Sequence, residues 1–208
     1  MLYFSGFFLG MILSFLGQLP LGTMSMTATQ IAVQENFRSA WKYSIGVALI
    51  EMVYLRGVLS GMQWIMENRK IFDVFNWVTV VLFLGFGIMS FITAQKQDPA
   101  KKALLLNNRL NRFLLGMSMS ALNPLQIPFW FLWTGYFLNL GWLKPGFTSF
   151  NFFTGGSALG TMGGLAVYMY GGNWLVSKMN TNNRSLNKIM GVIFIVAGIV
   201  QLYRVLLA

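Results

Sequence analysis

The 208-residue chain contains no cysteine and no histidine. It therefore has no disulfide bonds, no thiol nucleophile, no thiolate or imidazole metal ligands, and no histidine for acid/base catalysis. The remaining serine, lysine, tyrosine and carboxylate side chains form no recognisable catalytic pair along the sequence. We accordingly predict that the protein is not an enzyme and that it carries no cofactor and no resident metal.

Charge is also scarce, because only 10% of the residues are charged and five are acidic, whereas 56% are hydrophobic. A soluble domain of this composition would have too little polar surface to cover itself, which indicates a polytopic membrane protein. The net charge of +10 could suggest nucleic acid. However, the basic residues lie in short connections between apolar stretches, where they orient a membrane protein, so no nucleic-acid partner is expected.

Six apolar stretches have the length of about 20 residues that a membrane-spanning helix needs. They are Leu2 to Met24, Ala40 to Met62, Phe72 to Ala94, Phe113 to Leu140, Thr148 to Leu175 and Leu186 to Leu207. The connections are too short for a folded soluble domain. The first stretch lacks a basic flank and a cleavage site, so we interpret it as a retained span. The predicted fold class is an all-α, multi-pass membrane protein with six transmembrane helices.

Orientation follows from the basic residues of alternate connections. The first, third and fifth carry Arg38, Lys42, Lys96, Lys101, Lys102, Arg109, Arg112, Lys178, Arg184 and Lys188. The opposite side carries only Arg69, Lys70, Lys144 and Arg204, the last interpreted as a snorkelling side chain. Because basic loops stay on the cytoplasmic side, both termini are predicted to lie outside.

Two prolines interrupt the apolar stretches at matching places. Pro20 breaks the first stretch and Asn123-Pro124 breaks the fourth, and the two prolines are separated by half the chain length. A proline in a spanning helix frees backbone groups that hydrocarbon cannot satisfy, so each break must face protein, water or a ligand. Paired breaks of this kind are typical of transport sites.

Further matches indicate an internal duplication. Gly46, Val53-Tyr54 and Gly57 in the second stretch match Gly160, Val167-Tyr168 and Gly171 in the fifth, and Val81, Phe83, Gly87 and Ile88 match Val192, Phe194, Gly198 and Ile199. The predicted halves are residues 1–94 and 113–208, joined by a basic cytoplasmic connector, 95–112. An odd number of spans per half inverts the second half, which favours alternating access. The connector is either an interfacial helix on anionic lipid or a solvated loop.

One order of motifs carries a family resemblance. It comprises Phe15-Leu16-Gly17-Gln18-Leu19-Pro20-Leu21-Gly22, then Gly46-Val47-Ala48-Leu49-Ile50-Glu51, then Leu122-Asn123-Pro124 and Phe129-Trp130. This order resembles the LysE/RhtB family of bacterial inner-membrane amino-acid exporters. The resemblance implies six spans in two inverted halves and secondary active export of amino acids or related small amphoteric metabolites. Two departures, Gly22 in place of a second proline and Leu125 in place of a lysine that many relatives have, suggest a divergent member.

Glu51 is the only carboxylate near the centre of a predicted span. A charge there costs roughly 3 kcal/mol on insertion scales, so it is not expected to face lipid. One interpretation is that Glu51 carries a proton or binds the ammonium group of a substrate. The alternative is a structural pair with Arg56, although a spacing of five residues is poor for two side chains on one helix face.

The two breaks complete the candidate site. A half-helix starting near Gly22 would offer free amide groups and a positive dipole end to a carboxylate. The alternative is that the prolines only kink the helices for packing. The polar or helix-breaking residues assigned to the site are Gln18, Pro20, Gly22, Thr23, Ser25, Asn123, Pro124 and Gln126, in addition to Glu51.

Gly156, Gly160 and Gly164 recur on one face of the fifth stretch. Small residues at this spacing let helices approach closely, so the stripe is interpreted as packing within the molecule, with a homodimer face or a sliding surface as alternatives. Two other functions remain open. One is an inorganic-cation exporter, which would need several converging ligands, and the other is a membrane subunit that transports nothing.

Overall fold

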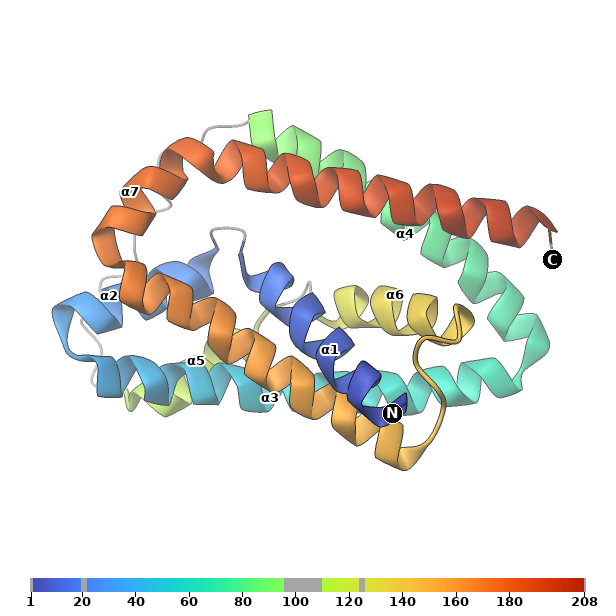
Figure 1. Ribbon diagram of the computed structural model, residues 1–208, viewed down its shortest axis with the longest axis horizontal. Coiled ribbons are helices and arrows are strands. Elements are labelled where there is room, and N and C mark those ends of the chain that lie inside the picture. The colour runs from blue at the N-terminus through green and yellow to red at the C-terminus, as the bar shows by residue number, and fades with distance from the viewer. Residues whose placement is uncertain (1, 20–21, 96–109, 124–125, 208) are drawn as a thin grey trace.

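The computed structural model describes residues 2–19, 22–95, 110–123 and 126–207 (Figure 1). Within these ranges all the regular secondary structure is α-helical, which confirms the all-α prediction. The helices are α1 (Leu2–Gln18), α2 (Thr23–Gln34), α3 (Phe37–Glu67), α4 (Arg69–Gln95), α5 (Arg112–Ala121), α6 (Gln126–Asn139) and α7 (Phe147–Leu207).

Among the residues that the structure describes, two helical segments are long and apolar enough to cross a membrane by themselves, Phe37–Glu67 and Lys70–Ile92. The segments Ser5–Gln18 and Thr23–Gln34 pass the same test together but are bent by 81°, so they would form a third, broken span. Helices α5 and α6 are too short to span separately because the expected fourth stretch is divided between them. Many large apolar side chains stay exposed on the outside, among them Val53, Val81, Phe147 and Tyr203. Such surface is typical of a protein that is covered by lipid.

The sequence prediction was wrong between residues 175 and 186, where a basic loop was expected. The helical backbone instead continues from Phe147 to Leu207, and it departs from helical angles at Gly172, with φ 51° and ψ −150°. No proline lies in this range to interrupt the backbone. Glycine adopts positive φ without steric cost, so Gly172 bends α7 into a first arm, residues 147–171, and a second arm, residues 173–207.

The two arms of α7 serve different parts of the molecule (Figure 1). The first arm packs against α1, α2 and α3, and the second arm runs along α4. Helix α5 lies along α3. An aromatic cluster of Phe83 on α4, Trp133 on α6 and Phe194 on the second arm ties the two regions together, with ring centroids 5.4 to 6.1 Å apart.

Glycines set the closest helix contacts. A Cβ added at Gly156 would overlap the carbonyl oxygen of Phe7, and one at Gly160 would overlap that of Met11. The glycine stripe therefore packs against α1 inside the molecule, as predicted, and that face is covered. An equivalent contact joins α3 and α5, where Gly46 and Gly116 each meet a backbone carbonyl of the other helix.

Candidate functional site

The carboxylate of Glu51 lies at the junction of α1, α3 and the first arm of α7, and its residue is 3% exposed. Ser14 on α1 donates a hydrogen bond to Oε1 at 2.8 Å, and Thr161 on α7 donates one to Oε2 at 2.6 Å. The two hydroxyl oxygens are themselves 2.5 Å apart. Glu51, Ser14 and Thr161 therefore form a closed polar triangle among otherwise apolar helices.

The glycine contacts explain how the triangle forms. Thr161 follows Gly160 directly, and Gly160 lets the α7 backbone reach the Met11 to Phe15 segment of α1. Gly10, one turn before Ser14, makes a similar contact with the carbonyl of Phe153. A side chain at either glycine would hold the helices apart and separate the hydroxyls.

Arg56 does not pair with Glu51. Its guanidinium carbon lies 5.1 Å from the centroid of the Phe147 ring and 5.7 Å from that of Phe150. These are cation–π distances, so the arginine is held by the start of α7 instead. In the part of the chain that the structure describes, the ion pair is between Arg112 and Glu35, and no basic side chain pairs with Glu51.

The first helix break lies one turn beyond Ser14. Helix α1 ends at Gln18, and α2 begins at Thr23 with Gly22 in an extended conformation at its N-cap, without a side-chain cap. Gly22 and Thr23 are exposed, whereas Ser25 is buried and its hydroxyl donates to the carbonyl of Gln18 at 3.4 Å. A half-helix starts where the sequence placed it. Pro20 lies outside the described residues.

The second break has a similar polar bridge. Helix α5 ends at Ala121 and α6 begins at Gln126. The buried hydroxyl of Ser120 donates to Oε1 of Gln126 at 3.2 Å, and the carbonyl of Asn123 accepts from the backbone amide of Gln126 at 3.3 Å. Pro124 lies outside the described residues.

Two tyrosines hold the ends of the helices that precede the breaks. The hydroxyl of Tyr54 on α3 donates to the carbonyl of Ala121 at the end of α5, at 2.9 Å. The hydroxyl of Tyr168 on α7 donates to the carbonyl of Leu19, just after α1. These are the tyrosines of the repeated Val-Tyr motif, and each binds a helix end from the opposite half of the sequence.

Tyr43 connects the two break regions from α3. Its hydroxyl lies 3.4 Å from the carbonyl oxygen of Met24 on α2, to which it donates, and 3.4 Å from the sulfur of Met119 on α5. The side chain is fully buried. Both methionines flank a break and are part of its packing. In the described ranges there is no group of three or more His, Cys, Asp or Glu residues that would hold a metal ion.

The structure thus gathers only part of the predicted site. Gln18 and Ser25 meet at the first break, and Asn123 and Gln126 meet at the second. Glu51 hydrogen-bonds neither group, because its partners are Ser14 and Thr161. Sequence reasoning missed these two and Tyr43. The signal that could have identified Ser14 and Thr161 is a hydroxyl side chain within an apolar run. Thr161 also directly follows Gly160 of the glycine stripe.

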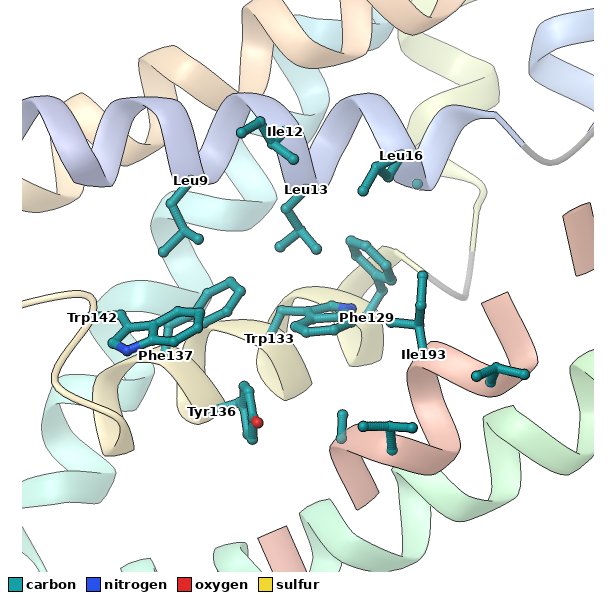
Figure 2. A pocket seen from close by; sticks show the side chains of 14 residues that line it. Leu9, Ile12, Leu13, Leu16, Phe129, Trp133, Tyr136, Phe137, Trp142 and Ile193 are labelled. Atoms are coloured by element: carbon teal, nitrogen blue, oxygen red, sulfur yellow. The ribbon is translucent and has the colours of Figure 1, made fainter. Parts of the chain in front are cut away.

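A cavity of about 420 Å³ lies against the face of α1 that carries Leu9, Leu13 and Leu16 (Figure 2). By helical periodicity this is a different face from the one that carries Ser14. It is lined by α1, α6, the segment after α6 and the second arm of α7. Leu13, the neighbour of Ser14, points into it from α1, and Trp133 and Phe137 form the facing wall on α6 (Figure 2). Helix α1 therefore stands between a polar junction and an apolar space.

Residues 15–204, nearly the whole chain, match the sequence model of a family described as LysE type translocator. Comparisons with curated proteins and with solved structures found no match.

Proposed function

The chain belongs to the LysE type translocator family and is a membrane transport protein; on that premise we propose that it is a proton-coupled secondary exporter of amino acids or related small amphoteric metabolites. The proposed location is the bacterial inner membrane, with both termini outside. The partners are then the small-molecule substrate, protons and the lipid bilayer. The observation that carries the proposal is the buried triangle of Glu51, Ser14 and Thr161.

Counting protons in the triangle supports a proton-carrying Glu51. Three oxygen pairs lie within 2.5 to 2.8 Å, but two hydroxyls supply only two protons. If Glu51 is protonated, its own O–H provides the third. Glu51 then donates to Ser14 in place of accepting from it, Ser14 donates to Thr161 and Thr161 donates to Glu51, so every contact contains one proton. If Glu51 is ionised, both hydroxyls donate to it and the 2.5 Å contact between them has none. The geometry therefore suits the neutral acid better.

Loss of that proton would require the triangle to open. Ser14 on α1 comes from the first half of the chain and Thr161 on α7 from the second. Glu51 is on α3, which lies between these two helices in the sequence. A shift of α1 relative to α7 separates the hydroxyls and admits water, which then stabilises the carboxylate. Proton exchange is thereby linked to helix movement, which is the requirement for coupling in an alternating-access transporter.

Two sets of contacts support the inverted repeat of residues 1–94 and 113–208. In one set, Tyr54 and Tyr168 each bind the end of the broken helix of the other half. In the other, α1 packs on the first arm of α7 through glycines, and α5 packs on α3 in the same manner. Both sets exchange partners between halves, as a two-fold relation would require. The connector, 95–112, then joins the halves on the cytoplasmic side.

The substrate is proposed to bind at the breaks. The start of α2 has no side-chain cap, and its first residues, Gly22 and Thr23, are exposed. Its amide groups are available to a carboxylate, which the helix dipole would also attract. Ser14 is one helical turn, about 6 Å, from the end of α1. An ammonium group held toward Glu51 would therefore lie about one helical turn from the break.

The test is proton-driven uptake into proteoliposomes, with wild type and Glu51→Gln measured on a panel of labelled amino acids under an imposed pH gradient. We expect uptake by wild type to follow the gradient and Glu51→Gln to lose that dependence. Arg56→Gln serves as the control, because this arginine contacts only aromatic rings among the groups described above. Equal gradient-driven uptake by wild type and Glu51→Gln would refute the coupling role, and a protein without transport would show no uptake in either form.

A further inference from the structure

The cavity beside α1 has the size of a ligand site. Its volume, about 420 Å³, falls in the range of small-molecule pockets in proteins. Figure 2 shows side chains from α1 above it, from α6 beneath it and from the second arm of α7 at its side. The walls are fixed by packing, since Trp133 makes edge contact with Phe83 at 5.4 Å and tilted contact with Phe194 at 6.0 Å. The α6 side of the space is therefore fixed, whereas its rim is open, since Ile12, Trp142 and Val196 are about half exposed.

The walls would reject charge. All fourteen lining residues are aliphatic, aromatic or glycine, and none carries a charge at neutral pH. The polar side-chain groups among them are the hydroxyl of Tyr136 and the indole N–H groups of Trp133 and Trp142, and the N–H of Trp133 is buried. A lysine, arginine or carboxylate side chain entering this space would lose its hydration without gaining an ionic partner. An aliphatic or aromatic side chain would gain from leaving water.

The cavity reaches both helix breaks. Leu16 and Gly17 line it from the last turn of α1, and Phe129 lines it from the first turn of α6. A Cβ placed on Gly17 would be 3.2 Å from the tip of the Phe129 ring. A larger residue at position 17 would press on this ring. A molecule held by its polar groups at the breaks therefore has the cavity next to it.

One polar group in the wall has no partner. The indole nitrogen of Trp133 is buried and finds no hydrogen-bond acceptor, although the residue is only 7% exposed. A buried N–H without an acceptor costs free energy, about 1 to 3 kcal/mol. Because this nitrogen is enclosed by protein, it offers no donor to a ligand, and the Trp133 part of the wall is apolar.

We propose that this cavity receives the side chain of the exported metabolite, and that the side chain is apolar or aromatic. The inference rests on the proposed function, since it assumes that the polar groups of the substrate bind at the breaks. It narrows the substrate class to amphoteric metabolites such as branched-chain, thioether and aromatic amino acids. Basic and acidic amino acids are excluded.

The experiment compares phenylalanine, alanine and lysine as labelled substrates in proteoliposomes containing wild type or Ile193→Trp. Ile193 lies in the cavity wall on the second arm of α7 (Figure 2), so the larger ring fills the space. Ile199→Trp is the matched control, because Ile199 is on the same arm, is 56% exposed and does not line the cavity. Retained alanine uptake shows that a variant is folded.

We expect wild type to prefer phenylalanine over lysine. Ile193→Trp should lower kcat/KM for phenylalanine by at least about tenfold, the scale of steric discrimination in apolar pockets, while alanine uptake is kept and Ile199→Trp behaves as wild type. Alanine uptake with unchanged phenylalanine uptake in Ile193→Trp would overturn the cavity assignment and leave the exporter intact. If phenylalanine uptake is unchanged and purified Ile193→Trp also binds less lipid than wild type, the cavity would be assigned to a lipid acyl chain. Uptake of lysine in preference to phenylalanine by wild type would also overturn the cavity assignment and leave the exporter intact. No uptake of any amino acid in the panel described above would overturn both proposals.

Discussion

The two faces of α1 are built in opposite ways. On one face, Ser14 lies in a junction so tight that glycines replace side chains and hydroxyls are 2.5 Å apart. On the other, Leu13 borders a cavity of about 420 Å³. A buried polar group gains from a partner at close range, because an unpaired one costs about 1 to 3 kcal/mol. Apolar walls can border empty space without breaking a hydrogen bond. Close packing thus makes the proposed proton site, and loose packing makes the proposed substrate site.

Filling the tight face should have the largest effect. In Gly160→Leu the side chain would overlap the Met11 carbonyl and force α1 away from α7. We expect a loss of roughly 3 kcal/mol or more in the free energy of unfolding, at or beyond the upper end for overpacked sites. Unfolding in mixed detergent would measure it. Gly155→Leu is the control, since nothing lies within 4 Å of its Cβ position, and equal losses in both variants would contradict the prediction.

Breaking the triangle without changing the packing should have a smaller effect, confined to coupling. Thr161→Val keeps the shape of the side chain but removes one hydrogen bond to Glu51. A hydrogen bond between neutral groups contributes about 0.5 to 1.5 kcal/mol, so proton-driven uptake should fall by up to about tenfold. The measurement is initial uptake rate against the imposed pH gradient.

Ser118→Ala provides the comparison for Thr161→Val. The Ser118 hydroxyl is exposed and bonds only to Leu114 in its own helix, at 2.9 Å. Its removal should leave the rate unchanged. If both variants lower the rate equally, the triangle has no special part in coupling.

The tyrosines extend the comparison to the helix ends. Tyr168 is fully buried and Tyr54 is only partly buried. Tyr168→Phe removes the hydroxyl that donates to the Leu19 carbonyl. Because water reaches this carbonyl less easily than it reaches the Ala121 carbonyl, the substitution should destabilise the protein by about 1 to 2 kcal/mol. Tyr54→Phe should cost less, because water can reach the Ala121 carbonyl. The two melting temperatures test this order, and a larger effect of Tyr54→Phe would reverse the interpretation.

The smallest effect is expected on the loose face. Leu9 borders the cavity, whereas Leu59 is fully buried in the core. Leu59→Ala should cost about 2 to 5 kcal/mol, but Leu9→Ala only about 1 kcal/mol because it enlarges a space that already exists. Equal losses in the free energy of unfolding would mean that the cavity is filled by a stabilising ligand or lipid in the purified protein.

Several elements could be read from the sequence because they depend on local chemistry. Gly22 at the start of α2 follows from the break after Gln18, and Glu51 stands out because a lone carboxylate in an apolar run needs a polar neighbour. The prediction of a loop before Leu186 also relied on local chemistry, and it was wrong. Basic and polar residues were taken as a sign of a loop, but nothing in that segment prevents a helix, and the turn is made by Gly172 alone.

The partners of Glu51 could not be read in this way. Ser14 and Thr161 are ordinary residues in their own helices and become a site only where α1 and α7 touch. The cavity has even less signal in the sequence, since Leu9, Trp133 and Ile193 are indistinguishable from core or lipid-facing residues before the helices are placed.

The sequence by itself determined that the chain is helical, apolar, broken at two matching places and provided with one buried acid, because composition, proline and glycine act over a few residues. Only the tertiary structure decided which hydroxyls surround that acid, which carbonyls the tyrosines hold and where space is left. Those outcomes depend on contacts between residues 37 to 149 positions apart, and the distances between the helices are set by how closely the glycines let them approach.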